Sequence, residues 1–212
     1  MHIVSAAAAP FFKNGYVVGC EHTAESVLID PGDEVEELLD AIRRQKLTVK
    51  ALLLTHAHVD HVTGVGRAKA ALKVPVWLHR DDQFLYDHAA DQARLFGLTI
   101  DPPPPVDAYY EPGAPLLFGR YVVDVFPTPG HCAGGVCLAI GPQATGEREL
   151  FVGDTLFAGS IGRTDLPGGD FDVLLRSIRE VLFTFPDDTP VHPGHGPATT
   201  IGAERRSNPF LQ

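Results

Sequence analysis

The sequence predicts a mixed α/β fold in which two mixed sheets pack between outer helices. Segments of strand length alternate with amphipathic helical segments in the first half of the chain, and strands followed by a helix return in the second half. The chain has 212 residues, of which 44% are hydrophobic, which is enough for one core of ordinary size. We therefore expect a single domain spanning residues 1–212.

The first half is expected to open with short antiparallel strands and to continue with alternating helices and strands. Period-2 and continuous apolar runs bounded by turn residues predict strands at 3–7, 16–20 (after the Asn14-Gly15 turn signal), 26–30, 49–54 and 74–78. Apolar residues at helical spacing predict helices at 34–45 and 62–72. Residues 80–96 form a polar stretch that is expected to be partly helical.

Four consecutive prolines at 102–105 are expected to hold an extended linker at a seam between the two halves. Beyond them, the pattern predicts strands at 115–118, 121–126, 136–140 and 149–152. A stripe of apolar residues predicts a final helix at 171–183.

Composition excludes several classes of partner. The net charge of −10 opposes binding to nucleic acid, and no apolar run approaches the roughly 20 residues needed to cross a bilayer. Three cysteines without a CxxC pair predict neither a disulfide framework nor a structural zinc finger. We expect a soluble, cytoplasmic protein with a small-molecule substrate, and the sequence does not indicate its oligomeric state.

The most informative segment places four potential metal ligands within six residues. It reads His56-Ala57-His58-Val59-Asp60-His61, directly after the predicted strand at 49–54. His56 and His58 are two residues apart at a strand end and so point to the same side, while Asp60 and His61 lie in the turn before the next helix. Imidazole and carboxylate suit zinc, iron, manganese or cobalt, so a metal site is the economical interpretation. A surface loop of solvated histidines or a closed structural zinc site is the alternative.

Three further clusters supply matching ligands: His131 in Thr-Pro-Gly-His, Asp154 in Phe-Val-Gly-Asp, and His195 in His-Pro-Gly-His-Gly. Each follows a predicted or possible strand and stands beside a glycine, which lets the backbone bend sharply. We expect the clusters to meet at one edge of the sheets.

This combination of motifs resembles the metallo-β-lactamase superfamily over nearly the whole chain. The resemblance implies an αββα sandwich that binds two divalent metal ions, zinc first and iron or manganese as alternatives. It implies that His56, His58 and His131 hold one metal, that Asp60, His61 and His195 hold the other, and that Asp154 bridges them. Asp60 and Asp154 would be the catalytic carboxylates of a metal-assisted hydrolysis without a Ser or Cys nucleophile.

Within the superfamily, the chain resembles the short bacterial form of the glyoxalase II group, which hydrolyses S-acyl glutathione. Residues 159–169 and the ending Glu-Arg-Arg-Ser-Asn-Pro-Phe at 204–210 carry this likeness. β-Lactam hydrolysis is not expected, because the zinc β-lactamases that resemble this pattern have Cys where this chain has Asp154. Only residues 196–212 follow the last ligand, so we expect no C-terminal helical domain for glutathione.

For three residues the sequence leaves two possible roles open. Arg163 either binds a substrate carboxylate or forms a salt bridge with Asp165 or Asp170. Cys132 is either a soft extra ligand or redox-sensitive thiol, or a small buried residue. His192 is either a structural residue or an outer partner that orients His195 or Asp154.

Two other functions remain open. The segment Gly162-Arg163-Thr164-Asp165 also resembles persulfide dioxygenases of the superfamily, which would use one iron at His56, His131 and Asp154. A non-catalytic metal-binding or sensor protein is the third hypothesis.

Elemental analysis of protein purified without added metal separates these three functions. The binuclear hydrolase predicts about two zinc, iron or manganese ions per chain, since all seven ligands are present. About one iron per chain would favour the oxygenase, and a persistently empty site would favour the non-catalytic protein.

Overall fold

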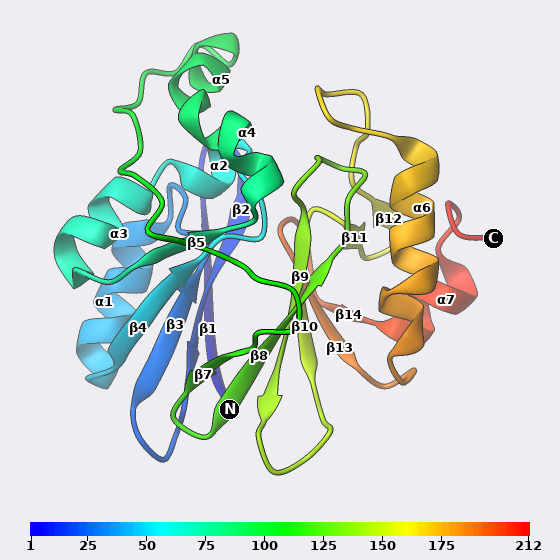
Figure 1. Ribbon diagram of the computed structural model, residues 1–212, viewed down its shortest axis with the longest axis horizontal. Helices are drawn as coiled ribbons and strands as arrows, with labels where there is room; N and C mark the ends of the chain where they lie inside the picture. Colours follow the sequence, from blue (N-terminus) through cyan, green and yellow to red (C-terminus); the bar gives the residue numbers. More distant parts are fainter. The chain divides into compact units, whose positions relative to one another are not determined.

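The computed structural model describes residues 1–212, which form two compact units. The first unit contains residues 1–111 and 117–120, and the second contains residues 112–116 and 121–212. The division falls shortly after the proline tract that predicted a seam. Figure 1 shows the helices and strands of each unit. The single-domain organisation stays a prediction.

The first unit is built on a six-stranded mixed sheet in the order β1-β2-β3-β4-β5-β6. The strands β1 to β3 pair antiparallel, and β3 to β6 pair parallel. Their bounds are β1 His2–Ala8, β2 Lys13–Gly19, β3 Glu25–Ile29, β4 Thr48–Leu53, β5 Val76–Leu78 and β6 Ala108–Tyr109. The parallel strands place the carboxyl ends of β3 and β4 at the same edge, where the first histidine cluster begins.

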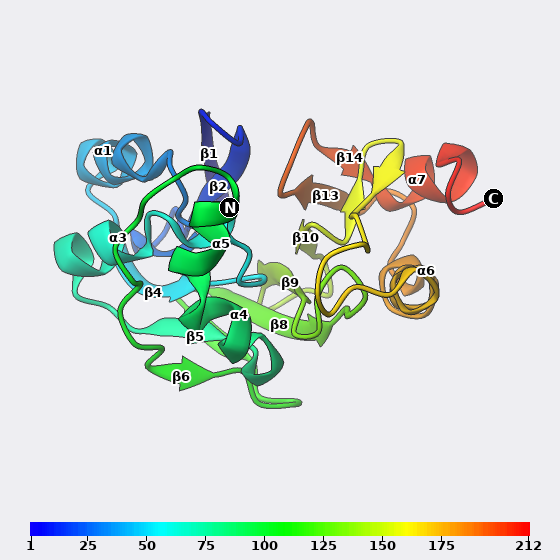
Figure 2. The same ribbon diagram turned by 90° about the horizontal axis from the view of Figure 1, so that it is seen from above.

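Helices cover one face of this sheet and its carboxyl edge. The helices α1 and α3 lie along the face, whereas α4 and α5 lie beyond the ends of β4 and β5 (Figures 1 and 2). The bounds are α1 Val35–Gln45, α2 Val59–Val62, α3 Val65–Leu72, η1 Arg80–Asp82, α4 Gln83–Asp87 and α5 Ala89–Leu95. α1 forms where the apolar stripe predicted it, with Glu36 and Glu37 in its first turn and Arg43 and Arg44 in its last.

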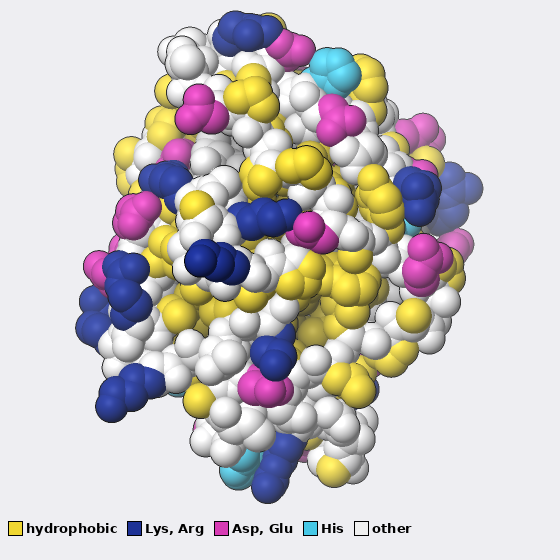
Figure 3. Space-filling view, turned by 60° about the vertical axis from the view of Figure 1, so that its left-hand side comes forward, with side chains coloured by type: hydrophobic (Ala, Val, Ile, Leu, Met, Phe, Trp, Pro, Cys, Tyr) yellow, Lys and Arg dark blue, Asp and Glu magenta, His cyan; other side chains and the backbone are white.

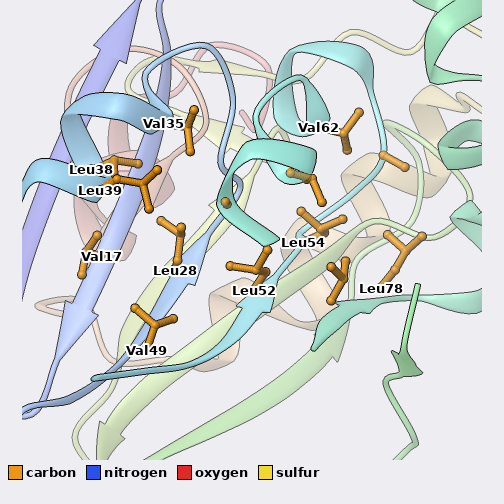
Figure 4. Close-up of a cluster of buried hydrophobic side chains, with 14 of the residues drawn as sticks. Val17, Leu28, Val35, Leu38, Leu39, Val49, Leu52, Leu54, Val62 and Leu78 are labelled. Atoms are coloured by element: carbon orange, nitrogen blue, oxygen red, sulfur yellow. The ribbon is translucent and has the colours of Figure 1, made fainter. Parts of the chain in front are cut away.

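The core of the first unit lies between its helices and the sheet (Figure 4). Val35, Leu38 and Leu39 of α1 face Val17 and Leu28 of the sheet, and all are buried. Burial of each such side chain contributes about 1.5–3 kcal/mol, which is why the apolar stripe, rather than local propensity, fixes the face that α1 turns inward.

The second unit contains a six-stranded mixed sheet and a small hairpin. The order of the sheet is β14-β13-β10-β9-β8-β7, and the pair of β10 with β13 is parallel. The bounds are β7 Leu116–Phe118, β8 Tyr121–Pro127, β9 Val136–Pro142, β10 Glu149–Gly153, β13 Pro190–Pro193 and β14 Thr199–Thr200, with the hairpin β11 Leu156–Phe157 and β12 Ser160–Ile161. β7 lies where the chain passes between the two units.

The helices of the second unit are α6 Phe171–Glu180, η2 Leu182–Thr184 and α7 Ile201–Ser207. Side chains cap the two longer ones: Asp170 accepts a hydrogen bond from the amide of Val173, and Thr200 accepts one from the amide of Ala203. Leu174 and Ile178 of α6 pack with buried residues of the sheet and the hairpin in one apolar cluster. The predicted α/β class with two mixed sheets and accompanying helices is therefore confirmed.

The structure corrects two local predictions. Asn14-Gly15 lies inside β2, opposite Ala7 and Ala6, because the turn between β1 and β2 is closed earlier by the hydrogen bond from Phe12 to Ala8. The helix predicted at 62–72 is two helices, α2 and α3. They are separated at Gly64, whose backbone approaches the carbonyls of Pro31 and Gly32 too closely for a side chain.

Six short elements were not predicted, namely β6, β11, β12, β13, β14 and α7. Each strand has four residues or fewer, and α7 has seven, so none provides enough positions for a hydrophobic period.

Charged side chains of both signs are interspersed on the face shown in Figure 3, without a continuous basic patch. No helix has the length and apolar composition needed to span a bilayer.

A buried ion pair lies beneath the turn that joins β3 to α1. The Lys13 ammonium lies 2.7 Å from the Glu34 carboxylate, and both side chains are 1% exposed. Lys13 also donates to the carbonyl of Asp30, while Glu34 accepts a hydrogen bond of 2.9 Å from the amide of Gly32. The pair thus connects β2 to both ends of the turn.

Replacing Lys13 with Met should lower the free energy of unfolding by about 3–5 kcal/mol, because Glu34 is left as an uncompensated buried charge. Urea unfolding measures this loss. Adding Glu34→Gln should recover part of it, since glutamine removes the charge and still accepts from Gly32. Lys50→Met is the matched control: its exposed pair with Glu25 should contribute no more than about 1 kcal/mol. Equal losses for Lys13→Met and Lys50→Met would contradict this assignment.

Candidate metal centre

The first histidine cluster follows β4 and is anchored by the carboxylate of Asp30. One oxygen of Asp30 accepts from the amide of Thr55 at 2.7 Å, and the other accepts from its hydroxyl at 2.6 Å. The second oxygen also lies 3.0 Å from Nδ1 of His61. Asp30 follows β3 and Thr55 follows β4, so the parallel pairing of these strands brings them together.

Two further side chains fix the middle of the same loop. The buried carboxylate of Asp82 accepts from the amide of Ala57 at 2.9 Å. Gln92 of α5 accepts from the amide of Val59 and donates to the carbonyl of Ala57, both at 3.2 Å. The backbone on both sides of His58 is therefore held by side chains that come from η1 and α5.

The four predicted ligands of this unit are brought together. The ring of His56 lies 4.9 Å from that of His58 and 4.0 Å from that of His61, measured between centroids. One carboxylate oxygen of Asp60 lies 3.7 Å from Nε2 of His61. All three imidazoles are buried, so their nitrogens meet in a region that water reaches little.

Hydrogen bonds select which nitrogen two of these rings present. Nδ1 of His61 faces the Asp30 carboxylate, an acceptor, and therefore carries the proton. The Thr55 hydroxyl donates to Asp30, so it accepts from Nδ1 of His56 at 3.1 Å. Both rings then keep the lone pair on Nε2, which is the tautomer that binds a metal ion.

The second unit brings together the other three predicted ligands. Nε2 of His131 and Nε2 of His195 lie 3.6 and 3.7 Å from the same oxygen of Asp154. Ligand atoms at 2.0–2.1 Å from a tetrahedral ion are roughly 3.4 Å from one another. The donor set and its spacing therefore fit a divalent metal ion.

The fold explains this second grouping. Asp154 follows β10 and His195 follows β13, and these two strands are parallel, so their carboxyl ends meet. The amide of Gly194 donates to the carbonyl of Gly153 at 2.7 Å, which ties the two strand ends together. Nδ1 of His131 donates to the carbonyl of Arg163 at 2.8 Å and leaves the lone pair on Nε2.

The side chain of Arg163 forms a salt bridge with Asp165, one of the two partners that the sequence suggested. Two hydrogen bonds of 2.8 Å join the guanidinium to both carboxylate oxygens. These bonds hold the pKa of Asp165 at about 2. The exposed guanidinium of Arg163 is thus bonded to Asp165. Substrate binding by Arg163 stays a prediction.

Nε2 of His192 lies 2.7 Å from a carboxylate oxygen of Glu149, and its ring stacks on Phe151; both of these contacts are with residues of β10. Cys132 is fully buried.

Sequence reasoning missed Asp30, Asp82 and Gln92, which hold the first histidine loop. A signal existed for Asp30 alone: like the ligands, it is a polar residue at the end of an apolar strand.

The sequence model of the metallo-beta-lactamase superfamily matches residues 8–197 of the chain. The protein belongs to this superfamily, whose members include metallo-hydrolases. The predicted resemblance is thereby confirmed.

Three similar proteins cover nearly all of the chain. Hydroxyacylglutathione hydrolase GloC of Haemophilus influenzae is 40% identical over 188 residues, which are 88% of this chain and 87% of that protein. The crystal structure of BLEG-1 B3 metallo-beta-lactamase has a TM-score of 0.89 and 39% identity, with 99% of each chain covered. The structure of TTHA1623 in a di-iron-bound form has a TM-score of 0.86 and 44% identity, over 98% of this chain and 100% of that one.

Replacing Arg163 with Ala should raise the pKa of Asp165 from about 2 toward its ordinary value of 3.8, because the bidentate hydrogen bonds are lost. The lowered pKa means that the charged pair is complete above pH 3.8 and is lost as the pH falls through about 2. Carboxyl chemical shifts in an NMR titration measure the midpoint. Arg43→Ala, which removes another exposed Arg–Asp pair, should leave Asp165 unchanged. A midpoint near 2 in Arg163→Ala would contradict the assignment.

Proposed function

We propose that the protein is a metal-dependent thioesterase of the glyoxalase II type, with S-acyl glutathione or a related small thiol ester as substrate. One observation carries the proposal: the nitrogens of His131 and His195 converge on one oxygen of Asp154 at metal-ligand spacing. The 40% identity to a hydroxyacylglutathione hydrolase supports the choice of substrate class.

The proposed ligands are the seven that the sequence predicts: His56, His58, Asp60, His61, His131, Asp154 and His195. Two divalent ions, when bound, would activate water and polarise the thioester carbonyl. We propose zinc as the first choice, because imidazole and carboxylate suit it. Iron is the main alternative, since a protein 44% identical to this chain has been crystallised in a di-iron-bound form.

The chain's own residues contribute orientation and charge. The hydrogen bonds to Asp30, Thr55 and the carbonyl of Arg163 keep three imidazoles in their metal-binding tautomer. Asp60 and Asp154 are the proposed catalytic carboxylates, placed beside histidine nitrogens. Water oxygen adds to the thioester carbon, the C–S bond breaks, and the products are a carboxylic acid and a thiol.

We also propose a small-molecule substrate and a cytoplasmic location. A net charge of −10 favours a small substrate over a nucleic acid. Cys20, Cys132 and Cys137 are buried and form no disulfide bond, which fits a reducing, cytoplasmic location.

β-Lactam hydrolysis is the second candidate. The sequence argument against it rested on Asp154 in place of Cys, yet a protein described as a B3 metallo-beta-lactamase is 39% identical to this chain over almost its whole length. Opening a β-lactam ring and cleaving a thioester both require attack of water on an activated acyl carbon.

Asp154→Ala should reduce thioester hydrolysis by at least about a hundredfold, since losing even an outer partner of a metal ligand costs 10–100-fold. The assay uses S-lactoylglutathione, with thiol release as the readout and circular dichroism to confirm the fold. Asp172→Ala, which removes an acidic side chain exposed on α6, is the control and should keep full activity.

Unchanged turnover in Asp154→Ala would refute the proposal. A wild type that opens β-lactams faster than it cleaves thioesters would favour the second candidate. Oxygen uptake with glutathione persulfide would favour a dioxygenase instead.

A further inference from the structure

The C-terminal motif that carried part of the sequence resemblance has a role that the proposed chemistry does not use. Within it, Glu204 belongs to α7 and Asn208 follows this helix; the side chains are 3% and 0% exposed. A carboxylate and an amide are rarely buried this deeply unless hydrogen bonds satisfy them. Their partners therefore show what the motif does.

The partners of both side chains lie at the tip of the β11–β12 hairpin. Glu204 accepts from the amide of Gly159 at 2.9 Å, and Asn208 donates to the carbonyl of Ser160 at 2.9 Å. Asn208 also donates to Glu204 at 2.8 Å, which links the two side chains. The hairpin lies beside α7 in Figure 2, and these bonds hold its tip to the end of the chain.

The same hairpin and the residues that flank it lie next to each proposed metal ligand of this unit. Asp154 lies two residues before β11, and the carbonyl of Arg163, two residues after β12, orients His131. Phe157 of β11 places its ring edge-on to His195, with 6.1 Å between centroids. Gly162 packs so closely on the carbonyl of Asp154 that no side chain fits there. A shift of the hairpin would therefore move the orienting groups of all three ligands.

Glu204 also restrains the segment that carries His195. Its second oxygen accepts from the hydroxyl of Thr199 in β14 at 2.6 Å. His195 lies in the connection between β13 and β14, so the same carboxylate fixes the end of this connection and the tip of the hairpin.

We propose that Glu204 and Asn208 are positioning residues, which orient His131, Asp154 and His195 for metal binding by clamping the β11–β12 hairpin and β14. This inference rests on the proposed use of these three residues as metal ligands. Neither positioning residue belongs to a group of side chains that could hold a metal ion.

The chain offers variants that separate hydrogen bonding from size. Glu204→Ala removes the acceptor. Glu204→Gln keeps it, because the amide oxygen can accept from Gly159 and Asn208 while the amide nitrogen donates to Thr199. Asn208→Asp has the shape of asparagine but turns its donor toward Ser160 and Glu204 into an acceptor. Ser207→Ala, which replaces an exposed neighbour bonded only within its own helix, is the matched control.

Zinc affinity, measured by competition with a chromophoric chelator on the metal-free protein, is the primary readout. We expect Glu204→Ala and Asn208→Asp to bind zinc about tenfold more weakly than the wild type, at the lower end of the 10–100-fold range for outer partners. Glu204→Gln and Ser207→Ala should bind it normally. The visible spectrum of the cobalt-loaded protein should change in the first two variants and not in the last two.

Ile178→Ala controls for general instability, because it removes core packing of α6 without a hydrogen bond to the hairpin. Wild-type zinc affinity in Glu204→Ala and Asn208→Asp would overturn the inference. The inference would also be overturned if the zinc affinity of every variant, including Ile178→Ala and Glu204→Gln, changed in proportion to its unfolding midpoint. A wild type that binds no zinc would instead refute the proposed function, so the two failures are distinguishable.

Discussion

The carboxylate of Asp30 is the group on which the first ligand cluster depends. It accepts hydrogen bonds from the amide and hydroxyl of Thr55 and faces Nδ1 of His61, so one buried side chain sets both the path of the loop and the tautomer of a ring. Its position depends in turn on the Lys13–Glu34 pair, because Lys13 donates to the Asp30 carbonyl. In a buried setting these bonds are strong and costly to leave unmade, which favours a single loop conformation.

The second unit reaches the same result with different groups. A backbone carbonyl, that of Arg163, fixes the ring of His131, and the hairpin that carries this carbonyl is bonded to Glu204 and Asn208. In both units the acceptor that orients a ligand belongs to a segment far away in the sequence. Orientation of this kind lets a metal ion bind without reordering its ligands, which is the usual purpose of outer partners.

The ligands could be predicted from the sequence because their signal is local. His56, His58, Asp60 and His61 are close neighbours in the chain, and the other three ligands each stand beside a glycine at the end of a strand or apolar segment. The anchors gave no such signal. Asp30 lies 25 residues from Thr55, and Gln92 lies 33 residues from Val59, so only folding shows that they meet. The partner of His131 is a backbone carbonyl, which no residue type can reveal.

The sequence by itself determined the chemistry and most of the regular structure. Residue type specifies imidazole and carboxylate donors, and hydrophobic period specifies α1 and the longer strands, since both are properties of short stretches of chain. Tertiary structure decided which nitrogen the rings of His61 and His131 present and where the helix predicted at 62–72 divides. The break at Gly64 depends on the backbone of Pro31 and Gly32, and the tautomers depend on distant acceptors. These features are set by contacts between segments, which periodicity and composition do not contain.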